Sequence, residues 1–137
     1  MARCRLFFIQ GIVLQNIQKR FELEKYITVL SFNNLYTFFK YRCGNHRLPV
    51  ESGRWQNLQR NERLCPLCGS SDIGDEYHYI LSCKALNYER RKYLPDYCKS
   101  NPNVIKLEKL FCSRNSIVLE KLCKFIKIIN VKVAPPG

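Results

Sequence analysis

Four potential metal ligands stand close together in the middle of the chain: Cys65, Cys68, His78 and Cys83, in the pattern C-x2-C-x9-H-x4-C. Zn²⁺ prefers four nitrogen and sulfur ligands in a tetrahedron, and three thiolates with one imidazole fill that shell without leaving a position for a substrate water. The pattern therefore predicts one structural zinc ion. The alternative interpretation is a set of ordinary buried thiols beside a surface histidine.

The first ligand pair has the sequence of a zinc knuckle, Cys65-Pro66-Leu67-Cys68-Gly69. Two intervening residues let both sulfur atoms face one ion. Pro66 sets φ in the turn, and Gly69 can adopt the positive φ that turns nearby backbone N–H groups toward the thiolates.

The second ligand pair is less regular, because residues five apart on a regular helix are separated by about 140° around its axis. We therefore expect His78 on the first turn of a short helix and Cys83 within that helix or at its end. Asp75 and Glu76 are close enough in sequence to orient the free ring nitrogen of His78. Their commoner role would be that of acidic residues at a helix start.

The composition suits one small intracellular domain. At 137 residues and 46% hydrophobic content, the chain can bury a modest core that a metal would reinforce. The segment from Met1 to Leu14 lacks a cleavage site of the signal-peptide type, and the chain has no N-x-S/T acceptor. We expect the nucleus or the cytoplasm, where a CxxC pair binds metal more often than it forms a disulfide. No apolar stretch is long enough to cross a membrane.

The net charge of +12 is unevenly distributed. The finger, residues 65–83, contains no lysine or arginine, whereas basic residues stand on both sides of it. Such flanks, interleaved with aromatic residues, favour RNA or DNA as the partner, because cations neutralise phosphates and aromatic rings stack on bases. The candidate contacts are His46, Arg47, Arg54, Arg60 and Arg63 before the finger, and Arg90 and Arg91 after it.

The hydrophobic pattern predicts a mainly α protein, a small helical domain organised around a single CCHC zinc knuckle. Residues 1–20 have no assignment, and residues 21–137 form the domain: a basic connector at 44–63, the finger at 65–83, and C-terminal helices within 85–131. An apolar face from Phe21 to Phe39 predicts helix until Gly44. Gly44, Pro49 and Gly53 predict that residues 44–61 are irregular, and Trp55 would anchor this connector to the core.

Three helices are predicted after the finger. Residues 85–94 form one that ends at Pro95, and residues 104–111 form a short one. Residues 117–131 form a third, with Val118, Leu122, Ile126 and Ile129 on one face and lysines elsewhere. We expect that face to pack in the core and the lysines to meet solvent.

Four motifs carry a family resemblance. They are Gly44-Asn45-His46-Arg47-Leu48-Pro49, then Glu51-x-Gly53-Arg54-Trp55, then Asn61-Glu62-Arg63-x-Cys65-x-x-Cys68, and finally Asp75-Glu76-Tyr77-His78-Tyr79-x-Leu81-x-Cys83. In this order they resemble the C-terminal CCHC zinc-binding tail of the reverse-transcriptase polyprotein of non-LTR (LINE-like) retrotransposons. The resemblance covers roughly residues 21–130. It implies that the four Cys and His residues bind zinc and that His46, Arg47, Arg54 and Arg63 contact RNA or target DNA beside a polymerase.

The sequence does not predict an enzyme. It has no Y-x-D-D aspartate pair with which a polymerase holds its metal ions, and no E-x-K element of a restriction-like nuclease. We therefore expect a non-catalytic accessory module, a detached tail whose natural partner includes the polymerase part of a longer polyprotein. The alternative function is a zinc-stabilised protein-interaction module, which the 117–131 helix and an exposed apolar patch would support.

Overall fold

The computed structural model describes residues 25–134, and within them the fold is helical, with no strand and one isolated bridge between Leu64 and Ile73. In chain order the elements are α1 (Lys25–Val29), α2 (Phe32–Arg42), α3 (Pro49–Trp55), the 3-10 helix η2 (Arg60–Glu62), the π-helix η3 (His78–Ser82), the 3-10 helix η4 (Lys84–Leu86), α4 (Asn87–Tyr93), the 3-10 helix η5 (Asp96–Cys98), α5 (Val104–Phe111) and α6 (Ser116–Val133). The predicted mainly α fold is confirmed.

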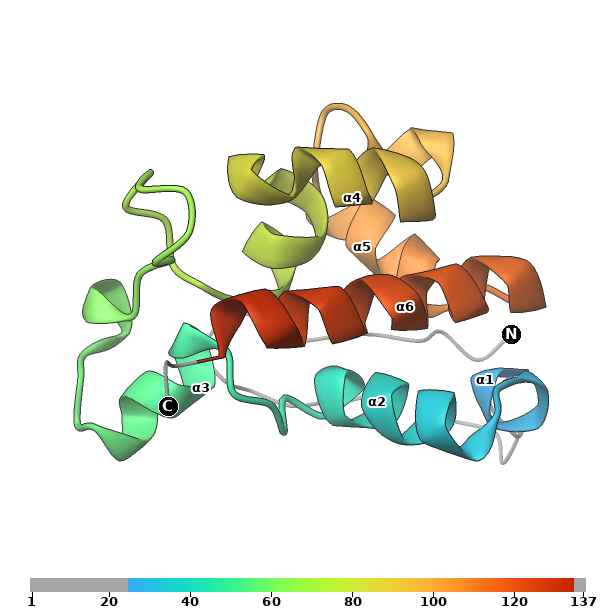
Figure 1. The fold of residues 1–137 in the computed structure, drawn as a ribbon, viewed down its shortest axis with the longest axis horizontal. Helices are drawn as coiled ribbons and strands as arrows, with labels where there is room; N and C mark the ends of the chain where they lie inside the picture. The colour runs from blue at the N-terminus through green and yellow to red at the C-terminus, as the bar shows by residue number, and fades with distance from the viewer. Residues whose placement is uncertain (1–24, 135–137) are drawn as a thin grey trace.

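The long helix α6 forms the centre of the core. It contacts α1 and α2 on one side and α4 and α5 on the other, and Figure 1 shows it crossing the middle of the molecule between these two layers. Leu122, Ile126 and Ile129 are fully buried, while Lys121 and Lys124 are exposed. The predicted core face and lysine face of this helix are therefore confirmed.

Polar side chains define where the helices begin. Asn115 accepts hydrogen bonds from the N–H groups of Ile117 and Val118 at the start of α6, and Asn103 does the same for Lys106 at the start of α5. Ser31 caps α2 and so separates it from α1. The single helix predicted through this region is thus two helices, and the part of it before Lys25 lies outside the described residues, as does the unassigned segment 1–20.

The prediction of an irregular connector at 44–61 was wrong for its middle. Pro49 occupies the first turn of α3, where its missing N–H costs nothing, and Val50 and Glu51 on this helix are buried. Trp55 at the end of α3 is 85% exposed, so the expectation that it anchors the connector to the core was also wrong.

No helix in residues 25–134 is both long enough and apolar enough to cross a membrane.

Candidate metal centre

The structure brings together the four predicted metal ligands. The Sγ atoms of Cys65, Cys68 and Cys83 and a ring nitrogen of His78 all lie within 4.8 Å of one another and could hold one metal ion. Cys65 Sγ lies 3.9 Å from Cys83 Sγ, and Cys68 Sγ lies 3.4 Å from His78 Nε2. Each of these two close pairs therefore joins one cysteine of the C-x2-C motif to one ligand of the H-x4-C motif.

The first two ligands occupy the predicted knuckle. The backbone N–H of Leu67 points at Cys65 Sγ, with a nitrogen to sulfur distance of 3.3 Å. Gly69 has a φ of +64°, and this left-handed conformation explains why a glycine follows the second cysteine. A backbone donor directed at the sulfur stabilises the thiolate form that binds metal.

The second two ligands lie at the ends of the π-helix η3. The Cys83 N–H donates to the carbonyl of His78 five residues earlier, at 2.6 Å. A π turn is wider than an α turn. Residues five apart therefore come closer to the same side of the helix than the regular 140° separation would allow. His78 on the first turn and Cys83 at the end confirm the expected placement, and the π geometry explains it.

The ring nitrogen of His78 that faces away from the cluster contacts Ser82 and Asp72. Its Nδ1 lies 3.2 Å from Ser82 Oγ and 3.7 Å from Asp72 Oδ2. The Ser70 hydroxyl donates to the same Asp72 oxygen at 2.7 Å and lies 2.9 Å from Cys68 Sγ. Ser82 is therefore the hydrogen-bond partner of this nitrogen, and Asp72 lies at ion-pair distance from it while it accepts from Ser70 of the knuckle.

Asp75 and Glu76 do not contact the His78 ring. Asp75 accepts a hydrogen bond from the His78 backbone N–H at 2.8 Å, the helix-start role that we considered commoner. The Glu76 carboxylate pairs with Nε2 of His46, and both side chains are buried. Burial, opposed by the hydrogen bond from His78, raises the pKa of Asp75 to about 6.

The protonation states within the cluster depend on whether a metal is bound. Burial and the neighbouring thiols raise the pKa of Cys83 above its usual value. The pKa of Cys68 lies below its usual value. Burial alone would raise it, but hydrogen bonds with Ser70, Cys65 and Cys83 outweigh the effect of burial. Burial lowers the pKa of His78, which favours the neutral imidazole that can bind a metal. A cation would replace protons on the buried thiols.

A buried arginine from α4 holds the π-helix in place. Arg90 is 4% exposed, and its guanidinium donates to the backbone carbonyls of Tyr79, Ile80 and Cys83 at 3.2, 2.8 and 2.9 Å. These carbonyls lie within and just after η3, where the regular helical pattern is interrupted. Arg90 therefore satisfies backbone acceptors next to a ligand, and its positive charge lies close to the thiolates.

Three of the predicted nucleic-acid contacts have internal roles. His46 pairs with Glu76, Arg90 binds the carbonyls of η3, and Arg63 donates to the carbonyls of Leu58 and Val50. Their polar atoms are engaged inside the fold, so we do not expect them to contact a nucleic acid directly.

The other four predicted contacts remain at or near the surface. Arg47, Arg54 and Arg91 are exposed, and Arg60 is partly exposed with its guanidinium 3.5 Å from Asp75. Among the aromatic residues interleaved with them, Trp55 and Tyr88 are exposed, while Tyr41 and Tyr79 are buried. Of the predicted contacts, these four arginines and the rings of Trp55 and Tyr88 are the ones that solvent reaches most readily.

Ser70, Asp72 and Ser82 around the ligands were not predicted, and neither was the internal role of Arg90. The signal for Asp72 and Ser82 was weak, because each is one polar residue in a segment with several. No cysteine in residues 25–134 forms a disulfide, and the four that stand outside the cluster join no other group that could hold a metal in this range.

Comparison of the chain with protein-family models, with curated proteins and with solved structures found no match.

Proposed function

We propose that the cluster binds one structural zinc ion. Tetrahedral zinc, with Zn–S bonds of about 2.3 Å and a Zn–N bond of about 2.0 Å, separates two sulfurs by about 3.8 Å and a sulfur from the nitrogen by about 3.5 Å. The corresponding distances here are 3.9 Å between Cys65 and Cys83 and 3.4 Å between Cys68 and His78. Thiolate and imidazole ligands also suit zinc better than Mg²⁺ or Ca²⁺, which prefer oxygen. Four protein ligands leave no open position, so the ion has a structural role.

The zinc-clamped domain binds RNA or DNA as a non-catalytic module. The observation that carries this proposal is the exposure of Arg47, Arg54 and Arg91 on both sides of a finger that itself has no lysine or arginine. The metal centre and Arg90 position these flanks, and the flanks supply the positive potential that attracts phosphates. Trp55, which follows Arg54 in the sequence, and Tyr88, which shares α4 with Arg91, offer exposed rings.

The four sequence motifs suggest the context in which this binding occurs. Their resemblance to the CCHC tail of non-LTR retrotransposon polyproteins favours a module that holds RNA or target DNA beside a polymerase. Gly53 and Arg63, which belong to two of these motifs, lie against each other, since a Cβ on Gly53 would come within 2.5 Å of Arg63 Cγ. The motifs therefore include residues whose packing supports the finger, in addition to the metal ligands.

The test is the salt dependence of nucleic-acid binding, measured by fluorescence anisotropy with a labelled RNA or DNA oligonucleotide. The double variant Arg47→Ala, Arg54→Ala should keep its fold and reduce the slope of log K against log salt by about 0.7–0.9 for each phosphate that is no longer neutralised. The matched control is Lys121→Ala, Lys124→Ala, which removes the same charge from exposed positions of α6. Equal slopes of log K against log salt for the two double variants would show that Arg47 and Arg54 do not contact the nucleic acid.

A second function, a zinc-stabilised protein-interaction module, is favoured by one observation. One face of the predicted 117–131 helix packs in the core, and α2 presents an apolar face to solvent. Phe32 is 81% exposed and Phe39 51% exposed, and with Ile27, Leu35 and Tyr36 they line a shallow apolar pocket. If this face is the principal binding surface, Phe32→Gln, Phe39→Gln should abolish partner binding and leave the salt-dependent nucleic-acid affinity unchanged.

A further inference from the structure

A cavity of about 570 Å³ lies between α2, the loop that follows it and the last turn of α6. Its volume falls within the range of roughly 300–1,000 Å³ that is typical of sites for small molecules and cofactors. The metal centre does not use this cavity, because none of the four ligands lines it.

The lining of the cavity suits an anionic ligand with several hydrogen-bonding groups. Lys40 on α2 and Arg47 on the loop supply two cations, and the described lining contains no aspartate or glutamate. Asn45 on the loop and Asn130 on α6 also line the cavity, and their side-chain amides can both donate and accept. Two cations with flanking amides are the donor set expected for a phosphate attached to a polar organic group.

Two further side chains lie at the cavity. The Tyr41 hydroxyl is buried and has no hydrogen-bond partner among the described residues, which is costly unless a ligand or a water uses it. Burial raises the pKa of Tyr41 well above its usual value, so the hydroxyl remains a donor. His46 also lines the cavity, but Glu76 holds its Nε2 and the Leu48 N–H holds its Nδ1. Because the Tyr41 hydroxyl has almost no accessible surface, neither side chain offers the ligand a polar atom, and both contribute only to the shape of the cavity.

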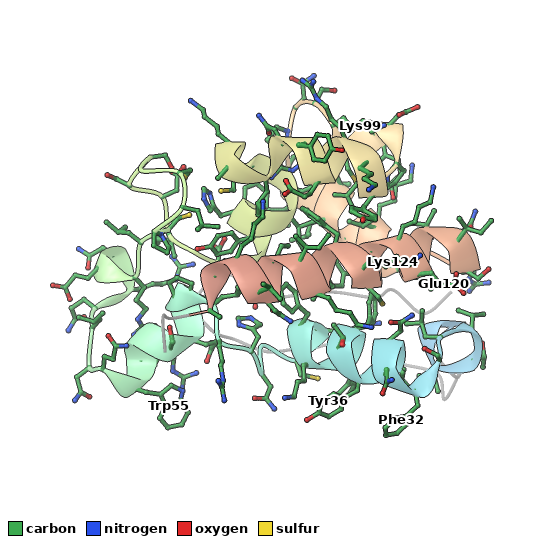
Figure 2. The ribbon with its side chains drawn as sticks, in the orientation of Figure 1. Phe32, Tyr36, Trp55, Lys99, Glu120 and Lys124 are labelled. Atoms are coloured by element: carbon green, nitrogen blue, oxygen red, sulfur yellow. The ribbon has the colours of Figure 1, made fainter. Side chains whose placement is uncertain are left out.

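The cavity has an aromatic rim. Tyr36 is 56% exposed, and the Lys40 ammonium lies 4.6 Å from the centre of its ring. Figure 2 shows Tyr36 on α2 and Trp55 on α3 projecting from the same lower edge of the molecule. An exposed ring can stack on a base that is unpaired, whereas the bases of a duplex are already stacked on one another.

We propose that this cavity accommodates one nucleotide of a single-stranded RNA or DNA, with its phosphate at Lys40 and Arg47 and its base against Tyr36. The inference rests on the proposed nucleic-acid function and adds a preference for unpaired strands. Trp55 then offers a ring for another base of the same strand. Arg47 belongs both to the basic flank and to the cavity, and it connects the two.

The experiment compares a fluorescein-labelled 12-nucleotide single strand, as RNA and as DNA, with the corresponding DNA duplex, using the full zinc-loaded chain. We expect the single strands to bind at least about tenfold more tightly than the duplex. Tyr36→Ala should weaken single-strand binding by about 5- to 150-fold, the range for removal of one stacked base, and should change duplex binding less than about twofold. Lys40→Gln should also weaken single-strand binding.

Lys124→Gln is the matched control for Lys40→Gln, because it removes one lysine charge from an exposed position of α6 outside the cavity. Thermal melting of each variant checks that the fold is retained. Equal affinity for single strand and duplex, with no effect of Tyr36→Ala, would overturn this inference and leave the nucleic-acid function standing. Absence of salt-dependent binding to any of the three oligonucleotides would overturn both.

Discussion

At the scale of single residues, Arg90 connects the metal centre to the helical core. Its guanidinium bonds to three backbone carbonyls around η3, including that of the ligand Cys83. A divalent ion with three thiolates and one neutral imidazole has a net charge of about −1. A buried positive charge beside this centre offsets that negative charge, and such an arrangement is stable only while both partners are present.

The first prediction contrasts Arg90 with its neighbour Arg91. Replacing Arg90 by Ala leaves several buried carbonyls without donors and should lower the free energy of unfolding by roughly 3 kcal/mol. Arg90→Lys keeps the charge but loses the planar guanidinium group, and its free energy of unfolding should lie between those of the wild type and Arg90→Ala. Arg91→Ala, at an exposed position, should change stability by less than about 0.5 kcal/mol. Urea unfolding of the zinc-loaded chain measures all three, and equal stability of the two Ala variants would contradict the internal role of Arg90.

His78 makes the centre sensitive to acid. Burial lowers its pKa below the usual value, so the folded chain binds fewer protons than the unfolded chain as the pH falls below about 6.5. Acid therefore opposes folding in this range. A bound metal adds an effect of the same sign, because its ligands must lose protons before they can coordinate it.

The second prediction is that metal affinity falls as the pH is lowered from about 8 to about 5, because protons compete with the metal for its ligands. A chromophoric indicator that competes for zinc should report progressive release on acidification, accompanied by a decrease in helical circular dichroism. Cys112→Ser removes a half-buried thiol outside the cluster and should leave the release curve unchanged. If the wild-type chain retained its metal throughout this acidification, the assignment of thiolate and imidazole ligands would be wrong.

At the scale of elements, α3 supports the finger through a close approach of two residues. A Cβ at position 53 would come within 2.5 Å of Arg63 Cγ and 2.9 Å of Arg63 Cδ, so a glycine is required where the arginine crosses the helix. From that position Arg63 reaches the carbonyls of Val50 and Leu58. Arg63 lies two residues before the first ligand, and its packing against Gly53 therefore helps to determine where the knuckle begins.

The third prediction concerns the packing of Arg63 against Gly53. Gly53→Ala should displace the stem of Arg63 and lower the free energy of unfolding by about 1–3 kcal/mol, the usual cost of overpacking. Ser52→Ala, at the adjacent and only partly buried position, is the control and should be near neutral. Thermal denaturation of the two variants distinguishes them, and a neutral Gly53→Ala would mean that Arg63 does not fix the start of the finger.

Most of the elements could be predicted from the sequence where the pattern was long or had clear stop signals. The helix at 104–111 and the buried face of α6 were confirmed, because their apolar residues recur with the period of an α-helix. The ligand set was predictable, since Cys65 and Cys68 have a spacing that few other roles explain. The structure brings all four ligands together.

Other features could not be predicted, because they depend on tertiary contacts. A π turn leaves no periodic signature in five residues, so the close approach of His78 and Cys83 was visible only in the fold. The sequence does not distinguish an arginine that donates to backbone carbonyls from one on the surface. For this reason Arg63 and Arg90 were predicted to be nucleic-acid contacts. Trp55 was expected to anchor the connector to the core, but it stands at the end of α3 and is 85% exposed.

At the scale of the whole molecule, separate regions have separate tasks. The helices packed around α6 bury the core (Figure 1). The Cys and His cluster joins the loop after α3 to the helices that follow it. Much of the net charge of +12 remains on the surface outside the finger. We propose that the metal has a structural role. It holds the polypeptide so that the basic and aromatic residues on either side keep fixed positions.

The central claim is the metal centre, and native mass spectrometry with elemental analysis of the chain purified under reducing conditions tests it most directly. We predict one zinc per chain, absent from Cys68→Ser together with much of the thermal stability, because structural zinc contributes folding free energy on the order of 10 kcal/mol. Cys98→Ser, outside the cluster, should retain the full zinc content. A chain without zinc, or a Cys68→Ser variant with an unchanged melting profile, would contradict the zinc assignment.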